Sequence, residues 1–159
     1  MKQIELTQGK FAVIDDDDYE RVVSSGLKWH AHKDWNTYYA RASVIENGKK
    51  RFVLMHRLVL GLEATGYPLV DHIDHNGLNN TRANMRTATI SQNATNRTFG
   101  KLKYHYRGVI RKNEGWIARI KKNGKRKILG PYKTEEDAAR AYDRAAKELH
   151  GEFAVLNFP

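Results

Sequence analysis

The stretch from Val70 to Asn93, VDHIDHNGLNNTRANMRTATISQN, gathers groups that could do chemistry. It holds two histidines, two aspartates and several asparagines, and it has little apolar content. A histidine with an ordinary pKa of about 6.5 is largely neutral near pH 7 and can accept a proton from water. Carboxylate and amide oxygens can hold a hard divalent cation. The stretch is therefore either a polar surface loop or a site that binds a metal and breaks a bond.

The residues before this stretch predict short strands and turns. KFAVID (10–15) is typical of a strand, and Asp15–Asp18 predict a helix start and a solvated turn rather than a metal site. Asn47-Gly48 lies between two runs rich in aromatic and β-branched residues, which predicts a hairpin. MHRLVLGL (55–62) then shifts to helical spacing. His30 and His32 lie on an aromatic strand as structural residues, and no motif is assigned to residues 1–50.

Composition limits the class of protein. The chain has 159 residues and no cysteine, so it has neither disulfides nor thiolate-bound zinc. No apolar signal core or membrane-length run is present, which predicts a soluble, cytoplasmic protein. The formal charge is +10, and residues 101–159 carry 15 basic against 7 acidic side chains. A basic excess in one segment predicts a surface that binds a polyanion.

The basic segment also has its own pattern of elements. YRGVIRK, GWIARIKK and KRKILGPY are three strand-like runs joined by Asn-Glu-Gly and Asn-Gly turns, which predicts an antiparallel meander. TEEDAARAYDRAAKELHG predicts a helix that begins after a capping box formed by Thr134 and Asp137 and ends at Gly151. Small alanines on one stripe would let this helix lie close to the sheet.

Several motifs of this segment match one family. They are YRGV (106–109), Leu-Gly before Tyr132, AARAYDRAA (138–146) and the ending HGEFAVLNFP. With them, residues 104–159 resemble the APETALA-two/ethylene-response-factor DNA-binding domain. The resemblance implies a three-stranded sheet laid in the DNA major groove with one helix behind it. The DNA-facing candidates that it implies are Arg107, Arg111, Lys112, Arg119, Lys121 and Arg126.

Two positions depart from that family. Ile110 stands where arginine is usual and Ile128 where tryptophan is frequent, so base preference does not carry over. Trp116 is expected in the core rather than on a base. Ile110, Ile117 and Ile128 are natural candidates for the side that faces the helix, although the sequence does not set the strand register.

The opening stretch carries a second resemblance. MHRL (55–58), VDHID (70–74), NGLNNTRANMR (76–86) and SQNATN (91–96) resemble the HNH endonucleases, which have a ββα-metal fold. The resemblance implies His72 as the general base, Asn84 as the residue that orients the loop, and Asp71 and Asn93 as ligands of Mg²⁺ or another divalent cation such as Mn²⁺. This pair of domains is familiar among phage and mobile-element homing endonucleases.

Other polar residues near the stretch stay open. Asp74 and His75 suit either a supporting contact or a plain turn, and His56 is expected to pack or support rather than bind metal. Arg57 and Arg86 are candidates for phosphate contacts near the cut site, and so are Arg82 and Arg97, with a solvated surface role as the alternative.

Together these patterns predict an α+β protein. Its parts are a ββα-metal HNH domain with a β-rich extension at 1–93, a linker at 94–103, and a three-stranded sheet packed on one helix at 104–159. The predicted function is metal-dependent cleavage of duplex DNA by a homing-type endonuclease. The alternatives are a non-catalytic DNA-binding regulator on an HNH-like scaffold and, on charge alone, an RNA-binding protein. No membrane partner is expected, and the oligomeric state is open, with a monomer slightly favoured.

Overall fold

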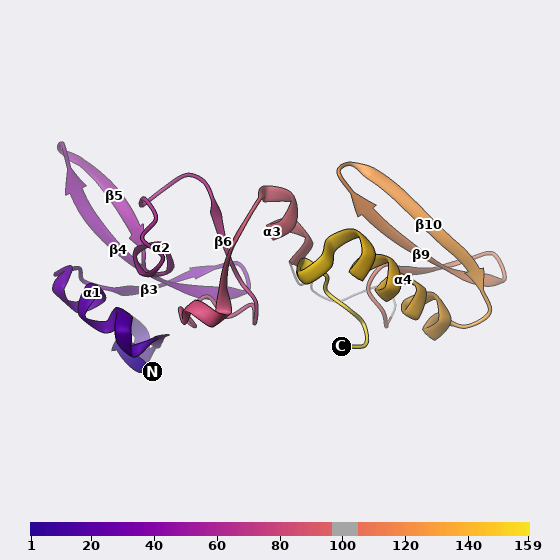
Figure 1. Cartoon of the computed structure of the whole chain (residues 1–159), viewed down its shortest axis with the longest axis horizontal. Coiled ribbons are helices and arrows are strands. Elements are labelled where there is room, and N and C mark those ends of the chain that lie inside the picture. The colour runs from indigo at the N-terminus through magenta and orange to yellow at the C-terminus, as the bar shows by residue number, and fades with distance from the viewer. Residues whose placement is uncertain (97–104) are drawn as a thin grey trace. The chain divides into compact units, whose positions relative to one another are not determined.

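The computed structural model describes residues 1–96 and 105–159 and confirms the α+β class (Figure 1). The chain forms two compact units, Met1–Thr89 and Ile90–Pro159, and each is described by itself. Residues 94–96 of the predicted linker belong to a helix, and its remainder, 97–103, lies outside the described residues. The predicted domain boundaries stay predictions. Across the described residues, no helix is long and apolar enough to cross a membrane.

A two-stranded ribbon and a short helix begin the N-terminal unit. β1 (Lys2–Glu5) pairs antiparallel with β2 (Phe11–Ile14) after a turn of 3₁₀ helix at Thr7–Gly9. The aspartate run becomes a second 3₁₀ turn, Asp16–Asp18, that leads into α1 (Tyr19–Ser24). The helix predicted to start at these aspartates is therefore present.

A three-stranded antiparallel sheet follows in the order β3-β4-β5 (Figure 1). Its strands are β3 (His30–Asp34), β4 (Thr37–Glu46) and β5 (Lys49–Leu54), and α2 (Met55–Val59) follows directly. Asn47 and Gly48 have φ of 51° and 72° between β4 and β5, so the predicted hairpin is confirmed. Ala31, Ala40 and Ala42 of this sheet join Met55 and Val59 of α2 in one core.

A second antiparallel pair ends the N-terminal unit. β6 (Leu69–His72) pairs with β7 (Met85–Ala88), and the register places Asp71 opposite Arg86. The connection between the two strands contains the 3₁₀ turn Arg82–Asn84 and most of the polar stretch. The predicted catalytic residues therefore lie on and around one short two-stranded ribbon.

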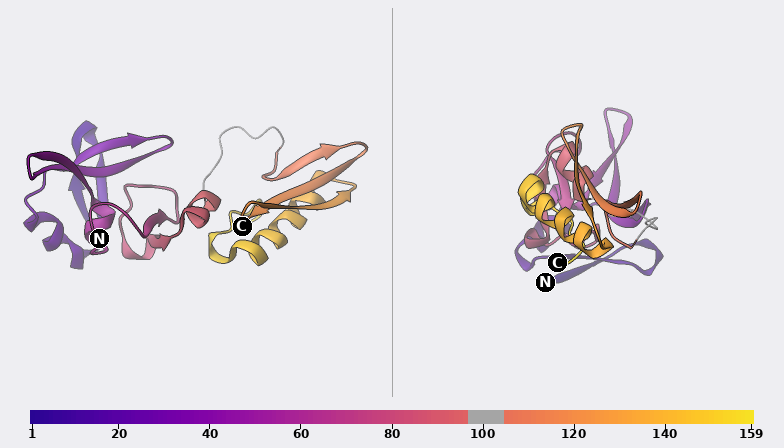
Figure 2. Two further views of the ribbon diagram at one scale, coloured as in Figure 1. Left: turned by 90° about the horizontal axis from the view of Figure 1, so that it is seen from above. Right: turned by 90° about the vertical axis from the view of Figure 1, so that its right-hand side faces the viewer.

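The C-terminal unit starts with α3 (Ile90–Asn96) and then forms the predicted meander in the order β8-β9-β10. The strands are β8 (Val109–Lys112), β9 (Gly115–Lys122) and β10 (Lys125–Tyr132). α4 (Glu135–His150) lies along one face of this sheet (Figure 2) and is followed by the 3₁₀ turn Gly151–Phe153. Thr134 Oγ1 accepts the Asp137 N–H at 3.1 Å, which confirms the predicted cap.

Close packing between α4 and the sheet depends on small residues. Ala118, Ala145 and Ala146 are buried between them, with Tyr142 beside them. Gly108 has φ of 72°, and a Cβ added there would lie 2.3 Å from the Tyr142 ring. A side chain at this position would therefore push the helix away from the sheet.

The sheet face toward α4 differs from the one expected. Val109 pairs with Ala118, and both pack in the core under α4, so their face points to the helix. Ile110, Ile117 and Ile128 alternate onto the opposite face, and Ile128 is 55% exposed. The expectation that these three isoleucines face the helix is wrong, because alternation separates two faces without saying which one is covered. Trp116 packs against the core beside Val109, as predicted.

A buried carboxylate fixes the tail after α4. Asp143, 7% exposed, accepts hydrogen bonds from the backbone N–H groups of Asn157 at 2.8 Å and Phe158 at 2.9 Å. The Asn157 side chain then accepts the Arg107 N–H at 2.6 Å and donates to the Arg107 carbonyl at 3.3 Å. The tail is thus tied both to α4 and to the start of the sheet.

We expect Asp143→Ala to lower the free energy of unfolding of the chain by about 2–3 kcal/mol, since it leaves several buried donors unsatisfied. Urea unfolding followed by tryptophan fluorescence measures the change. The neighbouring Arg144 is exposed, so Arg144→Ala serves as the control and should shift stability by less than about 0.5 kcal/mol. Equal stability of the two variants would contradict this account of the tail.

Candidate active site and DNA-binding face

Asp74 organises the loop that follows β6. One carboxylate oxygen accepts the Asn76 N–H at 2.8 Å and the Asn84 side-chain amide at 2.9 Å, and the other accepts the Asn79 amide at 2.8 Å. Burial raises the pKa of Asp74, but these donors outweigh burial and hold the pKa below its ordinary value. The carboxylate is therefore ionised at neutral pH, and the loop folds around its charge.

Asn84 completes this loop. Its side-chain oxygen accepts the Asp74 N–H at 3.0 Å, and its amide also donates to the Asn79 carbonyl at 2.8 Å. These bonds tie Asn84 to both ends of the loop, and its orienting role stays a prediction. Asp74 also joins the turn, whereas His75 is exposed at φ of 62° and donates its backbone N–H to the His72 carbonyl.

The N-terminal residues brace the same loop from outside. Val13 of β2 accepts the Asn80 N–H at 2.7 Å and donates its own N–H to the Leu78 carbonyl at 2.8 Å. The Gly77 N–H donates to Thr37 Oγ1 at 2.9 Å. A Cβ on Gly77 would lie 2.5 Å from the Tyr39 ring and 2.6 Å from the Tyr38 carbonyl, so only glycine fits. Residues 1–50, which carry no motif, thus form the scaffold of the loop.

His72 is buried, with 6% exposure, among polar and aromatic side chains. Its Nε2 lies 3.4 Å from Asn80 Oδ1, and its ring centroid lies 5.2 Å from that of His56 and 5.7 Å from that of Tyr39. The Asn80 amide group donates to the Leu78 carbonyl at 3.2 Å, which leaves its oxygen facing Nε2. An amide oxygen only accepts, so this contact is a hydrogen bond in the tautomer that carries its proton on Nε2.

Both buried histidines are held neutral. Burial lowers the pKa of His72, opposed by Asn80 and by the charges of Asp74 and Asp71. Burial also lowers the pKa of His56 to about 3, helped by His72 and Arg57. His56 packs against Tyr39 and His72 rather than reaching a carboxylate, as ring centroids 5.7 and 5.2 Å away show. A neutral His72 is the form that can accept a proton.

Asp71 lies on β6 next to His72, at 5% exposure. Its Oδ2 accepts the Arg86 Nε–H at 2.8 Å, and both side chains are largely buried. The predicted ligand Asp71 and the predicted phosphate contact Arg86 are thus partners of one another. Asn93 is half-buried in α3, which belongs to the C-terminal unit.

Among the metal-binding groups that side chains of this protein offer, the oxygen donors suit a hard cation best. Asp71 and Asn93 offer carboxylate and amide oxygens, which are ligands that suit Mg²⁺. Within residues 1–96 and 105–159, no three histidine or acidic side chains gather as a metal site. Mg²⁺ usually takes few protein ligands and keeps several water or phosphate oxygens, so two such donors suit it.

Three of the predicted phosphate contacts are held by internal partners. Arg57 is 4% exposed and donates to the carbonyls of Glu63, Thr65 and Pro68, so it shapes that loop instead of facing solvent. Arg82 binds Asp18 through Nε and Nη2, at 2.8 and 2.7 Å. Asp18 is 2% exposed, so the expected solvated aspartate turn is wrong at this position. Arg86 binds Asp71 as described, and Arg97 lies outside the described residues.

The C-terminal sheet exposes a row of cations on the face away from α4. Lys121 pairs with Arg126 across β9 and β10, and Arg119 is two residues before Lys121 on the same face. Lys112 alternates onto this face from β8. Arg111 alternates toward α4 instead and lies 6.0 Å from the Trp116 ring at the sheet edge. Four of the six predicted DNA contacts therefore share one exposed face.

Arg107 takes a different position, before β8. Its Nε donates to the Tyr142 hydroxyl at 3.0 Å and its Nη2 to the Thr95 carbonyl of α3 at 2.8 Å. It lines a hollow of about 500 Å³ together with Arg119, Lys121 and His150. Burial lowers the pKa of His150, helped by Lys122 and Arg107. No acidic side chain of the described residues lines this hollow, so it suits an anion.

Sequence reasoning missed Asn80 and Tyr39 as neighbours of His72. Asn80 is fully buried, yet it stands in a run of asparagines that suits any turn. Tyr39 stands in a strand-like aromatic run. Tyr39 lies 33 positions from His72 along the chain, and Asn80 lies 8 positions from it. No local sequence pattern indicates that residues so far apart are in contact.

We expect stability to fall as pH decreases below about 6.5. The unfolded chain then binds a proton at His56, whereas the folded chain does so only near pH 3, so the unfolded state binds more protons. At pH 5 the loss should be about 2 kcal/mol relative to pH 8. Urea unfolding at several pH values measures this slope. His56→Phe should flatten it and the exposed His75→Ala should not, and a slope unchanged in His56→Phe would contradict the assignment.

Comparisons with known proteins support the two resemblances. No family model matches the chain. An uncharacterized HNH endonuclease of Acanthamoeba polyphaga mimivirus is 32% identical over 169 residues, which cover 98% of this chain and 89% of that protein. A dehydration-responsive element-binding protein of Oryza sativa subsp. japonica is 47% identical over 57 residues, 34% of this chain and 18% of its own.

A third relative is an ethylene-responsive transcription factor of Solanum lycopersicum, 48% identical over 59 residues, 35% of this chain and 24% of its own. The match thus spans about a quarter or less of these two plant proteins. The C-terminal segment is similar to the DNA-binding domains of plant transcription factors of the APETALA-two/ethylene-response-factor type. The mimivirus relative matches nearly the whole chain, and the chain belongs to the HNH endonuclease family.

Proposed function

We propose that the protein is a metal-dependent endonuclease that hydrolyses phosphodiester bonds in duplex DNA. The observation that carries this proposal is the buried, neutral His72, fixed by Asn80 at Nε2, in a chain of the HNH family. The two parts divide the work. The loop around His72 cuts, and the basic sheet of the C-terminal unit binds DNA.

His72 acts as the general base. Its Nδ1 takes a proton from the attacking water while Asn80 holds the Nε2–H, so the ring keeps one tautomer and one orientation. Tyr39 and His56 pack around the ring and exclude water from its sides. General-base assistance of this kind contributes roughly 10²–10⁴-fold to a rate.

Asp71 and Asn93 would hold the divalent ion, Mg²⁺ or Mn²⁺. A bound ion supplies charge stabilisation for the phosphate that becomes more negative as the bond breaks. Arg86 orients the Asp71 carboxylate through its 2.8 Å bond, and in this proposal that is its role. Asn84 holds the loop through Asp74 and Asn79, which keeps His72 in place.

The C-terminal unit provides affinity for DNA. Lys112, Arg119, Lys121 and Arg126 share its exposed face, where they can reach phosphates or base edges. Arg107 joins them at the hollow beside α3. The homing role that the resemblance implies would require this face to select a site, and that role remains a prediction.

The Asp71–Arg86 ion pair also favours a second candidate, a DNA-binding regulator without turnover. An arginine seated on the predicted ligand could replace a metal ion altogether. In that case the C-terminal face would still bind DNA, and the loop would be only a scaffold. The two candidates differ in a single property, which is cleavage that depends on a divalent ion.

We expect the chain to nick or cut supercoiled plasmid in Mg²⁺ and to lose this activity in excess chelator. His72→Ala should reduce the rate at least about 100-fold, as loss of a general base does. Plasmid binding by His72→Ala, measured by gel shift, should stay within twofold of the wild type. His75→Ala is the control, because His75 is exposed in the same loop and should keep full activity. A wild-type rate in His72→Ala would overturn the catalytic assignment, and DNA binding without any cleavage would favour the regulator.

A second expected outcome concerns the brace of the loop. Gly77→Ala places a methyl group against Tyr39 and the Tyr38 carbonyl, so the loop and His72 must shift. Displacements of about 1 Å can cost roughly 100-fold in rate, and we expect a loss of this order in the plasmid assay. Gly26→Ala is the control for an added methyl group that meets nothing within 4 Å, and because Gly26 has a φ of 64° the control carries backbone strain that Gly77→Ala does not. Equal rates in both variants would show that the brace does not position His72.

A further inference from the structure

One face of the β4–β5 hairpin is open to solvent. Cross-strand partners are Arg41 with Leu54, Ser43 with Phe52, and Ile45 with Lys50. Because side chains alternate along a strand, these six residues share one side, which we call the open face. Ile45 is 73% exposed and Phe52 41%, although both are large and apolar. Exposed apolar side chains in a contiguous group indicate a binding surface.

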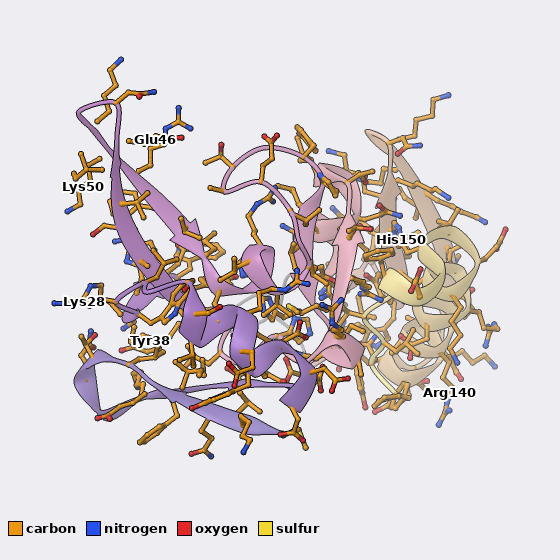
Figure 3. All side chains as sticks on the ribbon, turned by 60° about the vertical axis from the view of Figure 1, so that its left-hand side comes forward. Lys28, Tyr38, Glu46, Lys50, Arg140 and His150 are labelled. Carbon is orange, nitrogen blue, oxygen red and sulfur yellow. The ribbon has the colours of Figure 1, made fainter. Side chains whose placement is uncertain are left out.

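The other side of the hairpin has a different character. Ala42 is fully buried there, in the core of the N-terminal unit. Toward the tip, this side carries Lys49, Glu46 and Arg51, and Arg51 is bound to Glu46 at 2.9 Å. Glu46 and Lys50 point to opposite sides of the hairpin tip (Figure 3). The two faces therefore differ in free positive charge as well as in burial.

The positively charged side chains of the open face lie against the aromatic ring of Phe52. The Arg41 guanidinium lies 4.2 Å from the centre of the Phe52 ring, and the Lys50 ammonium lies 5.6 Å from it. Such cation–π contacts hold charged side chains against the sheet. The open face contains no acidic residue, so both charges act on whatever approaches. Positive charge combined with apolar contact suits the phosphates and sugars of a nucleic-acid backbone.

The open face runs directly into the candidate active site. Tyr39 lies on the same side of β4, two residues before Arg41, and its ring centroid is 5.7 Å from that of His72. From Tyr39 to Ile45 the strand extends about 20 Å at roughly 3.3 Å per residue. That length corresponds to about six nucleotides at 3.4 Å each. A duplex with one phosphate at His72 would therefore continue along the open face.

The N-terminal unit needs such a surface for its substrate. Arg57, Arg82 and Arg86 lie close to the loop, but internal carbonyls and carboxylates hold them. The charged groups of Arg41 and Lys50 instead lie against the aromatic ring of Phe52, on the same side of the hairpin as Tyr39, which contacts His72. They are the cations placed to meet DNA beside the reacting phosphate.

We propose that the open face of the β4–β5 hairpin binds the duplex on one flank of the phosphate attacked by His72. Arg41 and Lys50 contact backbone phosphates, and Phe52 and Ile45 pack on the sugars between them. The identity of the ligand rests on the proposed nuclease function. The position of the surface rests on the register, the exposure and the contact with the site.

The absence of cysteine in the chain allows a direct test. Ser43→Cys places a thiol on the open face, and Val44→Cys places one on the opposite face one residue later. Each full-length variant also carries His72→Ala, so that DNA is bound and not cut. Thiol modification by a maleimide is followed with and without supercoiled plasmid, at a concentration where gel shift shows complete binding. Each rate is compared with the rate of the same variant without DNA.

We expect plasmid to slow modification at position 43 at least fivefold and at position 44 less than twofold. Equal protection at both positions, or none at either while the plasmid is bound, would overturn the proposed face. The latter result would also favour a protein partner for Ile45 and Phe52. Absence of plasmid binding by the whole chain would refute the proposed function and this surface together. Protection at position 43 in a chain whose parent never cleaves would sustain the surface and reject the nuclease.

Neighbouring lysines give an independent measurement. Lys50→Gln removes a cation from the open face, and Lys49→Gln removes one from the other face. Each lost phosphate contact should lower the salt slope of DNA binding by about 1. We expect that change for Lys50→Gln and none for Lys49→Gln. Equal slopes for the two variants would overturn the assignment of Lys50.

Discussion

The ionised carboxylate of Asp74 is the group on which the loop between β6 and β7 depends. It accepts hydrogen bonds from Asn76, Asn79 and Asn84, so a loop with few apolar groups folds around a charge instead of a core. β2 then fixes the outer edge of that loop through the backbone of Val13. The backbone N–H of Asn80 is bound by β2 and its side-chain amide donates to the Leu78 carbonyl, so its side-chain oxygen is directed at His72. The chemistry of one histidine thus rests on a polar network that spans the N-terminal unit.

The two units use positive charge in opposite ways. In the N-terminal unit, arginines tie distant segments together, as Arg82 of the 3₁₀ turn before β7 does by binding Asp18, just before α1, and Val59 of α2. In the C-terminal unit, Arg119, Lys121 and Arg126 stay exposed on one face of a sheet. The first unit is nearly neutral because its charges cancel internally, and the second attracts polyanions because its charges do not. Because the charges of this unit nearly cancel, the pKa of His72 depends on burial and on a few neighbouring groups.

Sequence patterns predicted the elements of the C-terminal unit well, because its signals are local. Asn123-Gly124 supplies a turn, and Thr134 caps the helix within three residues. Alternation predicted two sheet faces but could not tell which one α4 covers, so the three isoleucines were assigned to the wrong side. In the N-terminal unit the motifs pointed to His72 and Asn84, whose roles stay predictions, whereas the partners of Arg57 and Arg82 could not be predicted. An exposed arginine and one bound to a residue 64 positions away look the same in a sequence.

The tail that ends on Asp143 has a consequence for biosynthesis. Because Asn157 and Phe158 complete the hydrogen bonds of that buried carboxylate, the C-terminal unit cannot close until those residues have left the ribosome. The strands of that unit and α4, which ends at His150, precede these two residues in the chain and are therefore synthesised before the segment that fixes them. Asn157 and Phe158 thus act as a latch, because the start of the basic sheet is tied to α4 only after this segment has emerged.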